Sequence, residues 1–196
     1  MKNQVSLTGL FRSLLLLSAV VLFSQCDTEE PEAENEEELI TTMSLTFVPT
    51  TGGGDPVFFS VFDADGDGPI EPVYTDGQES ILDAGVSYNV AIQVLNTTEN
   101  PAENITEEIL EEGDDHQFFF ETSNGLNLDF AYDDVDEDGN PVGVTSIFTT
   151  GEASEGTLTV TLRHEPNKSA EGVKTGDITK AGGETDVQAI FSVVIK

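Results

Sequence analysis

The strongest constraint on the fold is an alternation of apolar and polar residues in short runs from Leu39 onward. In 87–95, for example, Tyr88, Val90 and Ile92 alternate with small or polar residues. Successive side chains of a strand point to opposite faces, so this period of two predicts strands with one buried and one wetted face. Gly, Asp, Asn and Pro, which favour turns, separate the runs. The candidate strands are 40–48, 57–62, 87–95, 116–121, 128–132, 143–149, 157–164 and 187–195.

About eight strands at this spacing predict an all-β domain over 40–196, an antiparallel β-sandwich of immunoglobulin-like type. A closed β-barrel is the alternative. The chain has no tryptophan and one cysteine, so the landmarks of antibody domains are absent. Residues 104–112 break the strand pattern and predict either a short helix capped by Asn104 or an acidic edge. The run Phe118-Phe119-Phe120 predicts a strand that is buried on both faces.

The first residues have the pattern of an export signal. Lys2 and Arg12 supply positive charge, and an apolar run over 14–23 follows. The run is about half of the ~20 residues that a membrane-spanning helix needs. The single cysteine, Cys26, stands directly after the signal, which predicts a lipoprotein signal peptide over 1–25 and lipidation of Cys26 by acyl chains such as palmitate. The alternative is a secreted protein with a free thiol.

Residues 26–39 are rich in glutamate and lack apolar periodicity, which predicts a disordered acidic tether. All 38 acidic residues follow the signal, whereas two of the seven basic ones lie within it, so the expected mature chain carries 5 − 38, or −33. Such a charge repels phosphate backbones and excludes nucleic-acid binding. An acidic stretch directly behind a lipidated cysteine resembles the export signal by which Bacteroidota send lipoproteins to the outer face of the outer membrane, and this resemblance implies a lipoprotein that faces the cell surface. A periplasm-facing lipoprotein is the alternative.

Two loops place carboxylates at alternate positions before a glycine, an arrangement that suits the oxygen-seeking Ca²⁺ ion. An EF-hand would also need a glutamate at its twelfth position, where this chain has Tyr74 and Thr145. Aspartate and glycine also occupy hairpin turns for backbone reasons alone. The candidate calcium ligands are Asp63, Asp65 and Asp67 in the first loop and Asp134, Asp136 and Asp138 in the second.

The two histidines of the chain each stand beside carboxylates at the edge of an expected strand. Imidazole together with carboxylate can ligate Zn²⁺ or Cu²⁺, and a neighbouring acid often orients a metal-bound histidine. The candidate metal ligands are therefore His116, His164, Asp114, Asp115 and Glu165. The alternative interpretation is two partly exposed histidines in acidic turns. The chain has no glycine-flanked nucleophilic serine, no phosphate-cradling loop and no thiol beyond Cys26, so we expect no enzyme.

The segments 105–120, 162–168 and 182–186 resemble those of small outer-membrane lipoproteins of flavobacteria and other Bacteroidota, whose functions are unknown. The glutamine before Cys26 fits the looser lipidation signal of that group. Some of these proteins are labelled as type 1 periplasmic binding fold proteins. That fold is a two-lobed α/β structure, whereas the pattern of this chain predicts strands. Comparable lipoproteins are often companions of TonB-dependent outer-membrane receptors, so the resemblance implies capture of a nutrient or metal.

These observations favour a surface lipoprotein that binds a metal ion or metal complex as an accessory of an outer-membrane receptor. The second hypothesis is a structural or adhesive β-sandwich stabilised by Ca²⁺. A carbohydrate-active enzyme is the third and least favoured hypothesis, because paired carboxylates are so common in so acidic a chain that finding two is no evidence of glycosidase chemistry.

Overall fold

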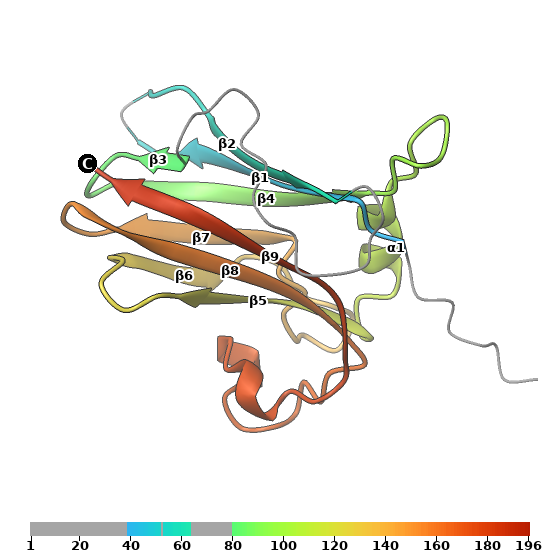
Figure 1. Cartoon of the computed structure of the whole chain (residues 1–196). Coiled ribbons are helices and arrows are strands. Elements are labelled where there is room, and N and C mark those ends of the chain that lie inside the picture. The colour runs from blue at the N-terminus through green and yellow to red at the C-terminus, as the bar shows by residue number, and fades with distance from the viewer. Residues whose placement is uncertain (1–38, 52, 64–79) are drawn as a thin grey trace, which may run out of the picture. The chain divides into compact units, whose positions relative to one another are not determined.

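The computed structural model describes residues 39–51, 53–63 and 80–196 (Figure 1). Every described residue belongs to one compact unit, Glu37–Lys196. The expected signal peptide, Cys26 and the tether before Leu39 lie outside the described residues, as do Asp65 and Asp67 of the first candidate calcium loop.

The described residues form two sheets and one short α-helix, which confirms a mostly β structure. The larger sheet has five strands in the order β2-β1-β4-β7-β6, and all of its pairs are antiparallel. Its strands are β1 (Thr42–Pro49), β2 (Val57–Phe62), β4 (Ser87–Leu95), β6 (Leu128–Tyr132) and β7 (Thr145–Thr150).

The second sheet has four strands in the order β3-β9-β8-β5. They are β3 (Ser80–Leu82), β5 (His116–Thr122), β8 (Ser154–His164) and β9 (Glu184–Ile195). The pairs β5–β8 and β8–β9 are antiparallel, but β3 pairs parallel with β9, so the expectation of a wholly antiparallel sandwich was wrong at this edge. A tight hairpin forces antiparallel pairing only on strands that it joins, and β3 is not a hairpin neighbour of β9.

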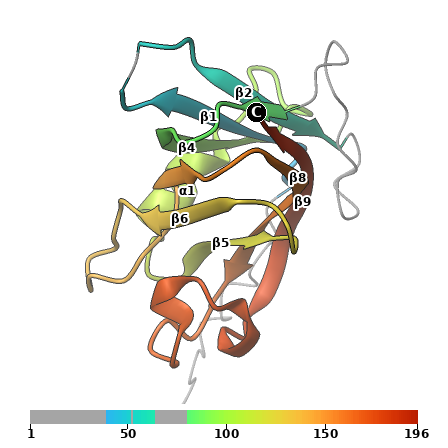
Figure 2. The ribbon, with the colours of Figure 1, turned by 90° about the vertical axis from the view of Figure 1, so that its left-hand side faces the viewer.

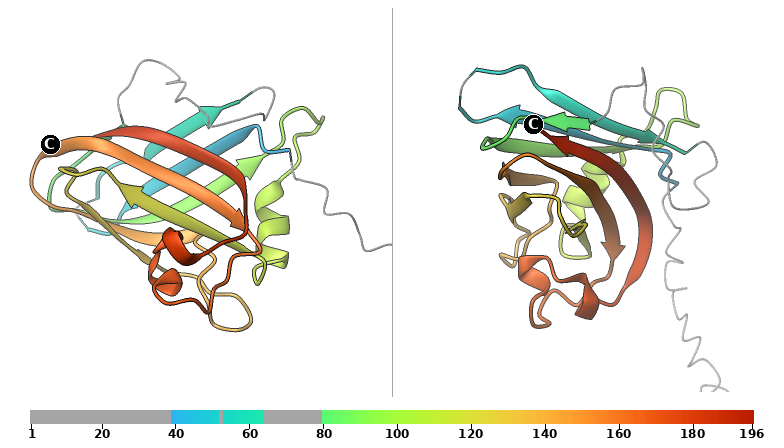
Figure 3. Two further views of the ribbon diagram at one scale, coloured as in Figure 1. Left: turned by 60° about the horizontal axis from the view of Figure 1, so that its bottom comes forward. Right: turned by 60° about the vertical axis from the view of Figure 1, so that its left-hand side comes forward.

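The two sheets share one apolar core, and Figures 2 and 3 show them as two layers. Phe47 of β1 lies 5.5 Å from Phe148 of β7, measured between ring centroids. Phe59 of the larger sheet lies 5.8 Å from Phe191 of β9, so aromatic contact crosses between the sheets. All four rings are at most 1% exposed. Burying each contributes roughly 1.5–3 kcal/mol of hydrophobic free energy, and this explains why the period-two pattern determines the faces of the strands.

The helix α1 (Ile105–Glu111) fulfils the prediction of a short helix at 104–112. Ile105 and Ile109, four residues apart, lie on one helix face and are buried in the common core. The hydroxyl of Thr106 accepts a hydrogen bond from the Val94 amide and donates one to the Val94 carbonyl, which fixes α1 to β4. Asn104 occupies the N-cap position but makes no capping hydrogen bond through its side chain. No helix of the described residues is long and apolar enough to cross a membrane.

Residues 165–183, which we call the excursion, connect β8 to β9. They contain two 3₁₀ turns, η2 (Val173–Thr175) and η3 (Ile178–Lys180). Val173 and Ala181 are fully buried against Phe119 in a small second apolar cluster. Phe118 and Phe120 belong instead to the main core. The expectation that β5 is buried on both faces is therefore confirmed, and the excursion is the cover of its outer face.

Candidate metal centre

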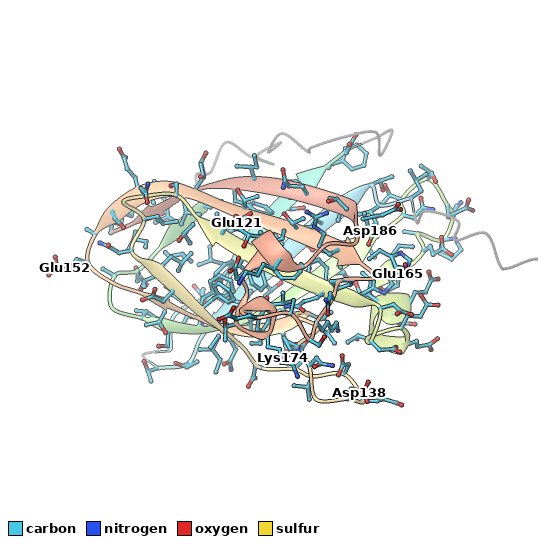
Figure 4. All side chains as sticks on the ribbon, turned by 90° about the horizontal axis from the view of Figure 1, so that it is seen from below. Glu121, Asp138, Glu152, Glu165, Lys174 and Asp186 are labelled. Atoms are coloured by element: carbon cyan, nitrogen blue, oxygen red, sulfur yellow. The ribbon has the colours of Figure 1, made fainter. Side chains whose placement is uncertain are left out.

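Three potential metal ligands meet where three adjacent strands of the second sheet come together. They are His116 at the start of β5, His164 at the end of β8 and Asp186 near the start of β9. One ligand atom from each residue lies within 4.8 Å of the others. This is the one such group of His, Cys, Asp and Glu within the described ranges 39–51, 53–63 and 80–196. Figure 4 labels Asp186, together with Glu165, at this end of the domain.

Strand register brings the two histidines together. His116 and His164 are direct partners in the antiparallel β5–β8 pair, and directly opposite residues have Cβ atoms about 4.5–5.5 Å apart. Their ring centroids are 4.6 Å apart with the planes tilted by 42°. On these strands, Phe118 and Leu162 stand two residues further along and belong to the main core. Period two therefore directs both imidazoles toward the inner side of the sheet.

A β-bulge brings in Asp186. The register of β8 with β9 shifts between Leu162, which pairs with Val187, and Arg163, which pairs with Thr185. Asp186 is thus the extra residue of the bulge. Strict alternation from the buried Val187 would direct Asp186 to the opposite face, but a bulge re-aims a side chain in this way. The carboxylate lies 3.9 Å from Nε2 of His116 and 3.8 Å from Nδ1 of His164.

His116 is held in a tautomer that leaves the lone pair of Nε2 free to bind a metal ion. Its Nδ1 lies 3.1 Å from the carbonyl oxygen of Glu112. A carbonyl only accepts hydrogen bonds, so Nδ1 carries the proton and donates it, and Nε2 bears the lone pair. Burial lowers the pKa of His116. This effect outweighs the hydrogen bond to the Glu112 carbonyl, which acts to raise the pKa, and so the neutral ring is favoured. Its buried Nε2 has no hydrogen-bond partner and faces Asp186.

The distances suit a small ion after a modest contraction. Ligand atoms around tetrahedral Zn²⁺, at bond lengths near 2 Å, are about 3.3 Å apart. The two nitrogen–oxygen distances of 3.9 and 3.8 Å exceed this separation by about half an ångström. The side chains of His116, His164 and Asp186 are 1%, 16% and 8% exposed, so the His164 side is the one open to solvent. The two imidazole nitrogens are at most 4.8 Å apart, so an ion would have to draw all three side chains closer together.

The other ligands expected from the sequence, Asp114, Asp115 and Glu165, are not part of this three-residue group. All three residues are exposed. Asp115 and Glu165 nevertheless contribute through the backbone, because the Glu165 amide donates a 2.7 Å hydrogen bond to the Asp115 carbonyl directly beside the histidine pair. The Asp115 carboxylate also acts to raise the pKa of His116. The structure thus joins the two predicted histidines but adds Asp186, which the sequence reasoning missed.

The second candidate calcium loop is organised around a lysine. Both oxygens of the Asp134 carboxylate accept backbone hydrogen bonds, from Gly143 at 2.7 Å and Thr145 at 2.8 Å. Asp136 accepts hydrogen bonds from the Asn140 amide at 2.7 Å and from the ammonium group of Lys168 at 3.0 Å. These bonds use the carboxylate oxygens that an ion would need.

Lys168 is only 6% exposed, so its ammonium group is a positive charge buried inside the domain. Its ammonium group also donates to the carbonyls of Gly113 and Pro141, so its three N–H donors are all engaged. Asp138, the third aspartate of the loop, is exposed. A calcium ion at this loop would therefore compete with Lys168 for the same oxygens. Of the first candidate loop only Asp63 is described, and its amide donates to the Thr41 carbonyl.

No protein-family model matches the chain, and no curated protein matches it significantly.

Proposed function

We propose that the domain binds a divalent transition-metal ion through His116, His164 and Asp186. The observation that carries the proposal is the buried Nε2 atom of His116. Its tautomer is fixed by the Glu112 carbonyl, its lone pair faces the Asp186 carboxylate, and a second imidazole lies against it. Metal-bound histidines characteristically donate their other ring N–H to a backbone carbonyl in this way.

Two imidazole nitrogens and one carboxylate favour Zn²⁺ or Cu²⁺ as the ion. Ca²⁺ takes six to eight oxygen ligands and Mg²⁺ prefers an octahedron of oxygens, so a site with two nitrogens disfavours both. Imidazole suits zinc, copper, iron and nickel, and affinity for a given nitrogen and oxygen site is usually highest for Cu²⁺. We therefore expect tighter binding of Cu²⁺ than of Zn²⁺, and no competition from millimolar Ca²⁺.

We further propose that the domain is immunoglobulin-like. An immunoglobulin domain has one sheet in the order A-B-E-D and another in the order C-F-G. The strands β1, β4, β7 and β6 follow the first order, and β5, β8 and β9 follow the second, with β2 and β3 added at the edges. A crystal structure in which β5 pairs with a strand other than β8 would contradict this assignment.

The cellular role that fits these features is capture of a metal ion or metal complex outside the cell interior, for a TonB-dependent outer-membrane receptor. It depends on lipidation of Cys26, on the acidic tether and on a non-enzymatic domain, all of which come from the sequence. Mass spectrometry of the membrane fraction should show an acylated Cys26. Protease treatment of intact cells should remove the domain, and its survival would place it on the periplasmic side.

Isothermal titration calorimetry of the full chain, prepared without a histidine tag, tests the site. We expect one equivalent of Zn²⁺ or Cu²⁺ to bind, and the Asp186→Asn variant to lose most of the affinity. The Asp114→Asn variant is the matched control, because Asp114 is a neighbouring exposed carboxylate outside the group. Equal binding by Asp186→Asn and the unmodified chain would refute the site. The variant with both His116→Ala and His164→Ala should bind nothing.

A further inference from the structure

The metal centre lies where the excursion leaves β8 and returns to β9. His164 is the last residue of β8 and directly precedes the excursion, and Asp186 follows its end by three residues. His116 lies on the third strand, beside Asp115, whose carbonyl accepts the amide hydrogen of Glu165, the first residue of the excursion. An ion that joins the three side chains would therefore tie together the strand ends from which the excursion leaves and to which it returns.

Both points where the chain changes direction lie next to the ligands. Glu165 has a positive φ of 49°, and Gly182 and Gly183 have values of 63° and 69°. A side chain at Gly183 would collide with the carbonyl oxygen of His164, so the two ends of the excursion cross in direct contact. A movement of the excursion about these points would displace the backbone of His164 and of the residues that lead to Asp186.

A small apolar cluster and a few hydrogen bonds hold the body of the excursion to the rest of the domain, and Gly176 at the end of η2 lies directly against the ring of Phe130. Val173 and Ala181 pack on Phe119, and the side-chain amide of Gln117 donates a 3.0 Å hydrogen bond to the Val173 carbonyl. The buried ammonium group of Lys168 fixes the first part. A segment that makes limited apolar contact opens locally at lower cost than the core strands do.

We propose that metal occupancy of the His116, His164 and Asp186 centre controls how readily the excursion detaches from the sheet. This inference rests on the proposed function. An ion that binds the closed form and not the form with separated strand ends favours closure by the factor 1 + [ion]/Kd. The domain would then have a metal-filled state with a fixed excursion and a metal-free state in which it opens more often.

The distribution of basic residues provides a sharp test. Beyond residue 25 the chain has only five lysines and arginines: Arg163, Lys168, Lys174, Lys180 and Lys196. Lys174 and Lys180 lie in the excursion and are exposed, and Lys168 is buried. Figure 4 shows Lys174 in this segment. Trypsin therefore has two candidate sites within the excursion. Both lie in 3₁₀ turns, which must open before a protease can bind the chain in extended form, so cleavage at them reports opening of the excursion.

The experiment measures initial rates of trypsin cleavage after Lys174 and Lys180 in the full chain, by mass spectrometry, with and without Zn²⁺. At a free Zn²⁺ concentration of one hundred times the calorimetric Kd, we expect cleavage to slow by up to about 100-fold. The Asp186→Asn variant, compared with itself with and without Zn²⁺, should show no such slowing and controls for any effect of zinc on trypsin.

The outcomes separate the two proposals. If calorimetry shows Zn²⁺ binding that requires Asp186, and cleavage at Lys174 and Lys180 is equally fast with and without Zn²⁺, control of the excursion is refuted while the proposed function stands. If Zn²⁺ does not bind, both proposals fall. If protection is equal in the unmodified chain and in Asp186→Asn, the effect does not come from this centre and the inference is overturned.

Discussion

Replacing Lys168 with methionine should destabilise the domain far more than a surface lysine replacement would. The ammonium group is an internal cation with three hydrogen bonds, to the Asp136 carboxylate and to the carbonyls of Gly113 and Pro141. The side chains of Lys168 and Asp136 are 6% and 1% exposed. Methionine fills the volume of the lysine stem but leaves a buried carboxylate without its cation. Removing one partner of a buried ion pair costs about 3–5 kcal/mol.

The stability difference between the unmodified chain and Lys168→Met should also depend on pH, which a loss of packing alone would not produce. Burial acts to raise the pKa of Asp136, but the hydrogen bonds from Asn140 and Lys168 outweigh burial and hold it below its ordinary value. The pair therefore stabilises the fold at neutral pH, and this contribution is lost as the pH falls through the lowered pKa. In Lys168→Met the carboxyl keeps its burial and its hydrogen bonds from Asn140 and from the Asp138 amide but loses the cation, so its pKa rises, and the difference in stability between the two proteins should narrow on acidification.

Urea unfolding followed by circular dichroism measures this difference at several pH values. Lys180→Met is the matched control, because Lys180 forms a 3.1 Å ion pair with Glu171 in which the side chains are 54% and 92% exposed. Exposed pairs of this kind contribute about 0–1 kcal/mol. Similar small losses in Lys168→Met and Lys180→Met, or a difference independent of pH, would refute the role of Lys168 as a buried cation.

Two further predictions concern contacts with backbone carbonyls, one made by Tyr132 and one by Gly183. Burial raises the pKa of Tyr132 to about 12, and the neutral phenol donates a 2.7 Å hydrogen bond to the Phe118 carbonyl. The neutral form therefore stabilises the fold fully below about pH 10, and this stabilisation is lost progressively as the pH rises toward 12. Tyrosinate absorbance and circular dichroism should show this alkaline loss of up to about 3 kcal/mol in the unmodified chain and not in Tyr132→Phe. An identical alkaline transition in both proteins would contradict the prediction. Gly183→Ala should cost several kcal/mol and weaken Zn²⁺ binding, because the new Cβ meets the His164 carbonyl, whereas Gly182→Ala, with a similar φ and open space, should cost about 1 kcal/mol. Equal unfolding free energies for the two alanine variants would show that the contact has no energetic weight.

Much of the strand content could be predicted because burial imposes period two on the sequence. The strands at 57–62, 87–95 and 128–132 have the expected bounds. The three residues of β3 were missed, since so short a run leaves no period to detect. Strands β8 and β9 begin three residues earlier than expected, at Ser154 and Glu184, where polar residues continue the ladder. Hydrogen bonding between strands extends pairing beyond the apolar run and leaves no trace in hydropathy.

The candidate site could be predicted only in part for a related reason. His116 and His164 attract attention because the chain has no other histidine. Their meeting depends on the register of β5 with β8, which the sequence does not state. Asp186 could not be found by alternation, because a bulge changes the face on which it lies. Neighbouring carboxylates such as Asp114 were equally plausible ligands on composition alone.

Zinc-edge X-ray absorption of the full chain loaded with one equivalent of Zn²⁺ tests the central claim most directly. We expect scattering from two imidazole rings and from oxygen at about 2.0–2.1 Å, with one imidazole contribution lost in His164→Ala. Oxygen-only coordination, or a spectrum unchanged in His116→Ala and in His164→Ala, would contradict the assignment of the ion to this centre.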